Sequence, residues 1–461
     1  MSDWRRLPKG AGAAIAVAAG LIAGLLLTPV MAPWLTGRGS LNPVARELRA
    51  QLGPADGEIG RFYRSDRYRP LWVAGRAIRP EATQLIGRLR TSDRDGLNPA
   101  TYHLQQLNQD VTGAGKDPKA LARAELDLSR AYAAYVRDLH LAAPVARLAF
   151  IDPAVRTPPL GAYGVLEQAA KAPTMTDALQ GATKVNPIYA SLRDAWNARR
   201  ASHGDDQTAR LLRINMERAR ALPPELGERY TLVNPAAETL WTYAGGESQG
   251  QMRVVVGKQT EPTPSMIGLV RYALFNPYWN VPPDLVRDKI APKVLAKGIA
   301  YFTDQHFQAL DGFKPNAAVL DPATIDWKAV ASGAKAIRVR QLPGPHNMMG
   351  TVKFMLPNRL GIYLHDTPMR GLFGGAARTD SAGCVRLQHP AQLAAWLFGR
   401  PETLDTKGAP DQRVDLPKPV PVYILYLTAQ PGPGGVSILP DIYNRDPAAL
   451  NAPGAPAATA R

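Results

Sequence analysis

The sequence has few residues suited to disulfide or metal chemistry. Its 461 residues include one cysteine, Cys384, so no internal disulfide can form. No CxxC or HExxH pattern accompanies the seven histidines, which gives little basis for a metal site. Helix-turn-helix, zinc-finger and RNP patterns are also lacking. We therefore expect neither a metal cofactor nor a nucleic-acid partner.

Acidic residues are in the minority, with 39 Asp and Glu against 55 Lys and Arg, which leaves a net charge of +16. An excess of this size favours an anionic neighbourhood, such as a membrane surface or an acidic wall polymer. The chain length and the 45% content of hydrophobic residues are sufficient for two or three domains with cores of their own.

The N-terminal region has the pattern of a secretory signal or a membrane anchor. Three basic residues within the first nine positions precede an uncharged stretch, 10–36, whose apolar centre "AAIAVAAGLIAGLLL" is long enough to cross a bilayer. Pro33 follows the small residues at which a signal peptidase would cut, and this favours an uncleaved anchor. We expect a single-pass inner-membrane protein with its catalytic domain in the periplasm. Its segments are a cytoplasmic N-terminus (1–10), a transmembrane anchor (11–31) and a linker (32–45).

The next region, 46–222, has helical periodicity. In "AELDLSRAYAAYVRDLHL" the apolar residues recur at spacings of four, three and four, as on one face of an amphipathic helix. These residues are Leu128, Tyr132, Tyr135 and Leu139. Helix breakers at 95–99 and 151–161 indicate loops between helices. We expect an α-helical scaffold domain.

A strand-rich domain is expected from residue 229 to 430. The runs "RYTLVN", "TLWTYAGG" and "GQMRVVVGK" are rich in Val, Thr, Tyr and Trp and are joined at turn residues, as in consecutive β-hairpins. Further strands are predicted at 351–357, 361–366, 384–387 and 420–428. The segment 283–340 is helix-like and then irregular, and is predicted to be an insertion. A C-terminal extension (431–450) and a disordered Ala/Pro-rich tail (451–461) follow.

The position of the thiol suits a nucleophile. Gly383 removes side-chain bulk directly before Cys384, which is predicted to lie where a turn meets a strand. A thiol needs a basic or cationic neighbour to ionise at neutral pH. His365 ends one predicted strand and Cys384 begins another, so adjacent strands would bring imidazole and thiol together. Backbone N–H groups around Gly383 and Cys384 would then receive the developing oxyanion.

Other interpretations of the same residues stay open at this point. His365, Cys384 and His389 are candidate zinc ligands, although no recognised zinc spacing accompanies them. Asp366 is a candidate third member of a triad, but in a strand its side chain points away from that of its neighbour, so the backbone is an equal candidate for orienting the imidazole. Arg386 is either a solvated charge or a contact for a substrate carboxylate.

The motif "HDTP" followed by "SAGCVRL" resembles the H-[GD]-T … S-x-G-C-[IV]-R motif of the L,D-transpeptidase (YkuD) catalytic domain. The order of histidine before cysteine agrees with that family, whereas papain-like and NlpC/P60 peptidases have the reverse order. The flanking segments "RINMERARALPPELGERYTLVN", "FNPYWNVP", "PGPHNMMGTVKFMLPN" and "DIYNRD" resemble its large, membrane-anchored, YcbB-like branch. "FYRSDRYRPLW" and "DGLNPATYH" resemble the helical scaffold of that branch.

The resemblance implies an α+β protein with an α-helical scaffold, a β-rich YkuD-type catalytic domain and an inserted helical capping subdomain at 283–340. It implies a cofactor-free, carbapenem-sensitive acyltransferase of peptidoglycan biosynthesis, cell-wall biogenesis and cell shape. In such an enzyme Cys384 is the nucleophile and His365 its base. The family places an oxyanion loop at Ser381, Ala382 and Gly383, and substrate contacts at Arg386, Tyr363, Trp279 and Asp366. The implied partners are peptidoglycan stem peptides, the inner membrane and cell-wall synthesis proteins.

Two features depart from the family pattern. Many members have a second histidine where this chain has Ala382, and the small peptidoglycan-binding module of this branch has no counterpart in the sixteen residues available at 193–208. Two alternatives to transfer also remain, an L,D-carboxypeptidase that passes the acyl group to water and a catalytically idle wall-binding scaffold. The sequence does not identify the acceptor.

Overall fold

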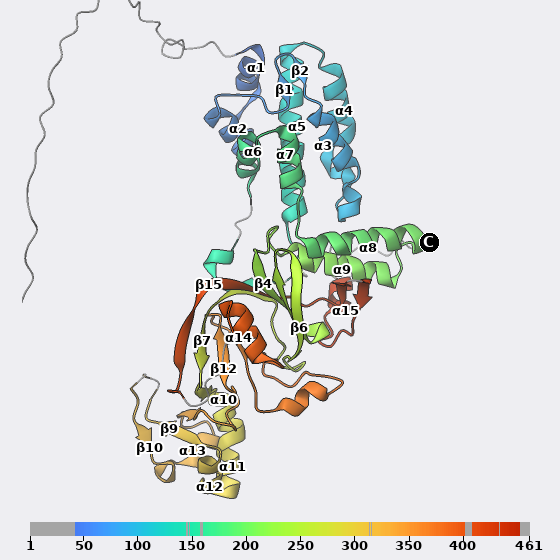
Figure 1. Ribbon diagram of the computed structural model, residues 1–461. Helices are drawn as coiled ribbons and strands as arrows, with labels where there is room; N and C mark the ends of the chain where they lie inside the picture. Colours follow the sequence, from blue (N-terminus) through green and yellow to red (C-terminus); the bar gives the residue numbers. More distant parts are fainter. Residues whose placement is uncertain are drawn as a thin grey trace, which may run out of the picture. The chain divides into compact units, whose positions relative to one another are not determined.

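The computed structural model of the chain describes residues 42–143, 146, 148–156, 160–312, 314, 316–401, 408–432 and 434–451 (Figure 1). The described residues from Pro43 onward belong to one compact unit. The predicted cytoplasmic segment, the anchor, most of the linker and nearly all of the tail lie outside the described residues. In the described part of the chain, no helix combines the length and apolar character of a membrane span.

Seven helices and one small hairpin build the first part of the described chain. The long helix α5 begins after Asp117, whose side chain accepts a hydrogen bond from the Ala120 N–H, and Pro118 occupies its first position. All four residues of the predicted apolar face are buried in its core. The elements are α1 (Pro43–Gln51), α2 (Gly57–Ser65), β1 (Val73–Ala74), β2 (Ala77–Ile78), α3 (Glu81–Arg90), α4 (Leu104–Gly113), α5 (Pro118–His140), α6 (Ala162–Lys171) and α7 (Met175–Ala182).

A buried glutamate of α5 is hydrogen-bonded to α2 and to the segment just before β1. Glu125 accepts hydrogen bonds from the Tyr63 hydroxyl at 2.6 Å and from the backbone N–H groups of Leu71 and Trp72 at 2.6 and 2.8 Å. Burial raises the pKa of Glu125 to about 7, although each of these bonds favours the ionised form.

The next two helices pack on the C-terminal extension. Helices α8 (Pro187–His203) and α9 (Gln207–Arg220) form a hairpin whose apolar face, including Trp196 and Met216, contacts Ala429 in β16 (Ala429–Gly432). Residues 193–208 are thus the end of α8, the turn and the start of α9. The segment predicted as one helical scaffold therefore divides into α1–α7 and an α8–α9 hairpin.

The strand-rich domain is a ring of eight strands with one added edge strand. Sequential pairing gives the order β12-β13-β14-β6-β5-β4-β15-β7-β3, and β12 also pairs with β7, which closes the ring. The strands are β3 (Ala149–Phe150), β4 (Arg229–Asn234), β5 (Thr239–Ala244), β6 (Glu247–Val255), β7 (Met266–Phe275), β12 (Val352–Met355), β13 (Leu364–His365), β14 (Val385–Leu387) and β15 (Gln412–Ile424). The helix α14 (Pro390–Phe398) contributes Leu393 and Leu397 to the same core.

The insertion is a separate subdomain with mixed secondary structure, so the prediction of a helical cap was incomplete. It contains a four-stranded sheet of order β10-β9-β11-β8 and a core of its own. Strands of two to four residues are too short to show an alternation in sequence. The elements are β8 (Trp279–Val281), α10 (Pro283–Leu285), α11 (Ala291–Lys297), α12 (Ile299–Asp304), β9 (Phe307–Leu310), β10 (Val319–Leu320), α13 (Trp327–Ala331) and β11 (Arg338–Gln341). We refer to residues 279–341 as the cap.

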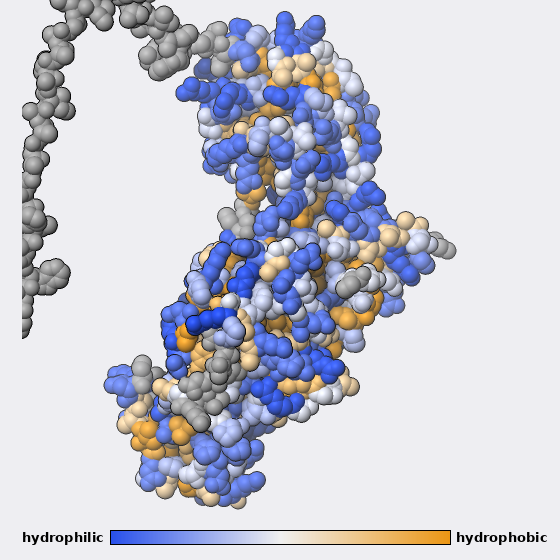
Figure 2. All heavy atoms as spheres, viewed as in Figure 1, coloured by the Kyte–Doolittle hydropathy of each residue, from blue (hydrophilic) through white to orange (hydrophobic). Residues whose placement is uncertain are grey.

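The two ends of the cap lie together, because β8 and β11 pair antiparallel with Val281 opposite Val339. The cap therefore has a two-stranded connection to the ring. On the face shown in Figure 2, apolar atoms gather over the cap. Val319 of β10 and Leu295 of α11 are among its exposed apolar side chains.

The C-terminal extension is ordered and tied to α9. It comprises β16, β17 (Gly435–Ile438) and α15 (Asp446–Leu450). A buried ion pair of 2.7 Å joins Arg218 of α9 to Asp446. The Tyr443 ring stacks on Tyr426, two residues after the end of β15, with centroids 5.0 Å apart.

Candidate active site

The pairing of β13 with β14 places the candidate catalytic residues on one face of the ring. The two short strands run parallel, with Leu364 opposite Val385 and His365 opposite Arg386. Leu364 and Val385 are fully buried in the apolar core. Because side chains alternate along a strand, His365 and Arg386 project from the opposite face. Tyr363 and Cys384 directly precede these strands, two positions before His365 and Arg386, and so belong to the same face.

His365 is buried and is oriented by the backbone. Its Nδ1 lies 2.5 Å from the carbonyl oxygen of Asp366. A carbonyl can only accept, so Nδ1 carries the proton and Nε2 is left as the acceptor of a neutral imidazole. Burial, with smaller contributions from the positive charges of Arg386 and Lys353, lowers the pKa of His365 to about 3. The imidazole is therefore neutral at pH 7 and able to accept a proton.

The Asp366 carboxylate is fully engaged elsewhere. It accepts from the backbone N–H and the hydroxyl of Thr351, at 2.8 and 2.7 Å, and pairs with Arg370. A Cβ on Gly350, which has φ +61°, would lie 2.4 Å from the Asp366 side chain, so the turn before β12 is closed tightly over this carboxylate. The orienting contact to His365 thus comes from the Asp366 carbonyl. The side chain instead fixes the turn before β12.

A network of hydrogen bonds shapes the turn that precedes Cys384. The Ser381 hydroxyl donates to the Cys384 carbonyl at 2.6 Å and accepts from the Gly383 N–H at 3.2 Å. Gly383 has φ +101°, a conformation that side chains rarely adopt, and a Cβ there would meet Ile362 at 3.0 Å. Because the Gly383 N–H is engaged by Ser381, the Cys384 N–H is the better candidate oxyanion donor. Ala382, which lies between Ser381 and Gly383, is exposed.

The thiol of Cys384 is partly exposed. Its Sγ donates to the carbonyl of Gly361 at 3.4 Å. Burial raises the pKa of the Cys384 thiol, while contacts with Tyr363 and the charges of Arg386 and Lys353 act in the opposite direction. Among the described residues, no hydrogen bond joins His365 to Cys384. The structure thus presents a neutral thiol and a neutral imidazole on one face.

Tyr363 and Arg386 flank this pair, and Trp279 does not. The Tyr363 ring meets the His365 ring edge to face, with centroids 5.7 Å apart. Arg386 lies 3.9 Å from the Asp380 carboxylate and 3.8 Å from the sulfur of Met369, which is an exposed apolar residue. Trp279 belongs to β8 of the cap and packs against Phe307. No described contact joins Trp279 to the residues around Cys384.

The sequence reasoning missed one charged residue on this face. Lys353 of β12 is the register partner of His365, and its Nζ lies 5.2 Å from the centre of the Tyr363 ring. Its neighbours Val352 and Phe354 are buried in the core. The alternation of "TVKFM" places Lys353 opposite that core, but only the pairing of β12 with β13 shows what it faces.

The zinc alternative has no geometric support in the part of the chain that the structure describes. No three side chains of His, Cys, Asp or Glu come together there as a metal ion would require. His389 precedes α14, is exposed, and makes no described contact with His365 or Cys384.

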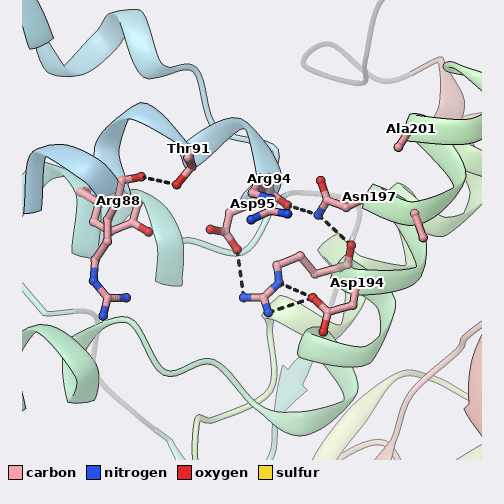
Figure 3. A pocket seen from close by; sticks show the side chains of 10 residues that line it. Arg88, Thr91, Arg94, Asp95, Asp194, Asn197 and Ala201 are labelled. Atoms are coloured by element: carbon pink, nitrogen blue, oxygen red, sulfur yellow. Dashed lines mark hydrogen bonds and ion pairs between the residues drawn. The ribbon is translucent and has the colours of Figure 1, made fainter. Parts of the chain in front are cut away.

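A cavity of about 540 Å³ lies away from these residues, between α3, α5 and α8. Figure 3 shows its polar lining, which includes Asp95 and Asp194. The Arg193 guanidinium pairs with two carboxylates there. The carboxylates belong to Asp95, 3.7 Å away, and Asp194, 2.9 Å away. The charge of Arg193 is therefore matched locally, and the cavity includes neither Cys384 nor His365.

Two parts of the chain are similar to known protein families. Residues 228–422 match the model of the L,D-transpeptidase catalytic domain, YkuD, and residues 57–195 match that of the scaffold domain. A curated protein of Haemophilus influenzae, whose name provisionally assigns it as an L,D-transpeptidase, is 34% identical over 246 residues. That alignment covers 51% of this chain and 48% of the relative, so the chain spans about half the length of the relative.

Two solved structures are also similar. One is an L,D-transpeptidase from Mycobacterium smegmatis, with 16% identity over 43% of this chain and 58% of that chain, at a TM-score of 0.21. The other is a mutant L,D-transpeptidase from Enterococcus faecium, with 14% identity over 44% of this chain and 52% of that chain, at a TM-score of 0.21. The match at 228–422 covers the eight ring strands except the last two residues of β15, and it includes Cys384. These residues thus form an L,D-transpeptidase catalytic domain of the YkuD family, which follows a region that matches a scaffold domain.

Proposed function

We propose that this protein is a peptidoglycan L,D-transpeptidase that forms 3→3 cross-links through an acyl-enzyme on Cys384. The observation that carries the proposal is the parallel pairing of β13 with β14, which puts His365 and Cys384 on one face of the family-matched domain. A cysteine nucleophile and a neutral imidazole on adjacent strands are the groups that acyl transfer requires.

The reaction begins when the Cys384 sulfur attacks the carbonyl carbon of the third residue of a donor tetrapeptide. The thiol proton passes to Nε2 of His365, a C–S bond forms, and the carbonyl oxygen becomes an oxyanion near the Cys384 N–H. Collapse breaks the C–N bond to the terminal D-alanine, whose amine takes the proton from His365. A side-chain amine of an acceptor stem then attacks the thioester and frees Cys384.

The surroundings of the thiol support a peptide substrate. Tyr363 and Arg386 border the thiol, and Leu360 and Met369 add exposed apolar surface next to Gly361 and Arg386. Arg386 is suited to a stem-peptide carboxylate, since a guanidinium binds carboxylates through paired hydrogen bonds. The acceptor is a second stem peptide in this proposal.

The location follows from the N-terminal sequence. An anchor at 11–31 with basic residues before it would hold the protein at the inner membrane, with the catalytic domain in the periplasm next to peptidoglycan and other cell-wall synthesis proteins. The net charge of +16 supports retention near an anionic wall.

Product analysis tests the proposal directly. Full-length protein is incubated with disaccharide-tetrapeptide, and the products are resolved by mass. We expect a cross-linked dimer that has lost one D-alanine, and Cys384→Ala should give none. A disaccharide-tripeptide as the only product would mean that the enzyme is an L,D-carboxypeptidase. Unchanged substrate with well-folded protein would mean an idle wall-binding scaffold.

A further inference from the structure

Lys353 is a buried cation whose ammonium lies over the Tyr363 ring, 5.2 Å from its centre, and has no counter-ion among the described residues. Its side chain is 9% exposed, and among the described residues it forms no hydrogen bond and no ion pair. Asp411 attracts the ammonium electrostatically but lies beyond ion-pair distance. An aromatic ring does not replace a hydrogen-bond acceptor or a counter-ion for a buried ammonium, so a lysine in this position calls for an explanation.

The position of Lys353 is defined by the strand pairing. It lies opposite His365 across β12 and β13, and His365 lies opposite Arg386 across β13 and β14. Lys353, His365 and Arg386 therefore form a row across three strands, with a cation on each side of the imidazole. Arg386 has the carboxylate of Asp380 3.9 Å away, whereas no described carboxylate lies within ion-pair distance of Lys353.

We propose that Lys353 is a substrate-binding residue whose ammonium holds a carboxylate of the donor stem peptide beside Cys384. This inference rests on the proposed function and adds to it a contact that recognises one anionic group of the donor. An incoming carboxylate would supply the hydrogen-bonding partner and the counter-charge that the buried ammonium lacks.

The contact between Lys353 and the substrate carboxylate would also make His365 a better proton acceptor. The charges of Lys353 and Arg386 both disfavour the imidazolium form of His365. A substrate carboxylate that neutralises Lys353 removes one of these penalties at the moment when His365 has to accept the thiol proton. Binding of the correct donor and activation of the thiol would then be coupled.

A pair of small alkylating reagents tests carboxylate recognition without any turnover. Iodoacetate and iodoacetamide react with the same thiolate and differ in one carboxylate, so the ratio of their rates at Cys384 cancels the thiolate fraction. We expect Lys353→Met to lower this ratio at least fivefold. Lys184→Met, which removes an exposed lysine paired with Glu225, is the matched loss of one charge and should leave the ratio unchanged. An unchanged ratio in Lys353→Met would overturn the proposal.

Donor kinetics identify the carboxylate. Loss of a charge-assisted hydrogen bond predicts a rise in KM on the order of 10- to 100-fold for Lys353→Met with the free tetrapeptide. Two further donors carry a carboxamide in place of one carboxylate, either on the terminal D-alanine or on the side chain of the third residue. The variant and the parent should have equal KM for the donor that lacks the contacted group. Equal losses for all three donors would overturn the proposal.

Folding is checked separately. Because Lys353→Met removes an uncompensated buried charge, we expect a melting temperature equal to or above that of the parent. A lower melting temperature with an unchanged alkylation ratio would assign Lys353 a structural role. If the parent turns over no donor, the proposed function fails, and the alkylation ratio still decides whether Lys353 recognises a carboxylate.

Discussion

The Tyr443 hydroxyl donates a 2.9 Å hydrogen bond to the carbonyl of Gly257, 186 positions earlier in the chain. The same hydroxyl accepts from the Thr263 N–H at 3.2 Å. Thr263 in turn donates through its hydroxyl to the carbonyl of Gly383 at 2.8 Å. The C-terminal extension is therefore connected, through one buried threonine, to the turn that carries Cys384.

Removal of the Tyr443 hydroxyl should loosen that turn. We expect Tyr443→Phe to lose about 1 kcal/mol of folding free energy and to slow acylation of Cys384 several-fold. Tyr423→Phe is the matched control, because its buried hydroxyl donates a 2.9 Å bond to the Leu226 carbonyl, away from the turn. Denaturation midpoints and acylation rates are compared. Equal acylation in the two variants would contradict a positioning role for Tyr443.

A carbapenem should acylate the protein once, because Cys384 is the sole thiol. Intact-protein mass spectrometry should show one adduct on the parent and none on Cys384→Ala. The same substitution should abolish cross-linking. An adduct on the alanine variant would mean that another residue is the nucleophile.

His365→Gln should slow this acylation by 10²- to 10⁴-fold, the usual contribution of a general base. Stopped-flow or quenched acylation at fixed pH measures the effect, and a melting curve checks that the variant is folded. A rate equal to that of the parent would point to a different base.

The pH dependence of thiol reactivity should show a neutral resting pair. Burial raises the pKa of Cys384 and lowers that of His365 to about 3, so the thiolate–imidazolium pair is not the main form of the free enzyme at pH 7. Alkylation by iodoacetamide should therefore be slow at pH 7 and increase in alkaline solution as the thiolate fraction grows. A rate already on its plateau near pH 5 would show a preformed ion pair instead.

The cap should shield the acyl-enzyme from water. We predict that it covers the groove holding Cys384 and moves on substrate binding. Replacing 283–337 with a short Gly/Ser linker should leave a folded ring, because β8 and β11 bring the two ends together. The shortened protein should cross-link poorly and release more acyl group to water. An unchanged ratio of transfer to hydrolysis would assign the cap to partner binding.

Glu125 should make the stability of the scaffold depend on pH. Its pKa is about 7 when folded against 4.5 for an ordinary glutamate, so the folded state keeps a proton that the unfolded state releases. This contribution to stability is complete below pH 4.5 and is lost as pH rises to 7, by about 3 kcal/mol. Urea midpoints at pH 5 and pH 7.5 measure it. In Glu125→Gln this component should vanish, and an equal pH effect in parent and variant would exclude Glu125 as its source.

Local patterns in the sequence predicted several of the long elements, but the ten-residue strand β7 was not among them. The alternation and turn residues of "RYTLVN" and "TLWTYAGG" predicted β4 and β5, and the helical spacing of Leu128 and Tyr132 predicted the buried face of α5. Four short strands of the cap were missed, because a strand of two to four residues is too short to show an alternation of apolar and polar residues. The start of β15 at Gln412 was also missed, because three prolines follow in "DLPKPVP" and a bulge accommodates them.

The sequence predicted those residues of the candidate site that belong to a recognisable motif, and missed those that depend on strand pairing. Motif residues such as Cys384 and His365 are identified by their order along the chain, and the parallel pairing of their strands agrees with the expected proximity. Lys353 carries no such signal, because its meaning depends on which strand lies beside β12. The role of the Asp366 carbonyl was likewise hidden. The Asp366 carboxylate is bound by Thr351, fifteen residues earlier, so the carbonyl and not the side chain orients His365.

The two-residue strand β3 affects where the chain can be cut to obtain the catalytic domain alone. Ala149 and Phe150 pair in parallel with Met266 and Ile267 of β7, so a segment from the helical half covers an edge of the catalytic ring. A fragment cut at residue 228, where the family match begins, would leave those backbone groups of β7 without partners. Open strand edges of this kind recruit strands from neighbouring molecules. An excised catalytic domain should therefore self-associate at concentrations where the longer chain stays dispersed.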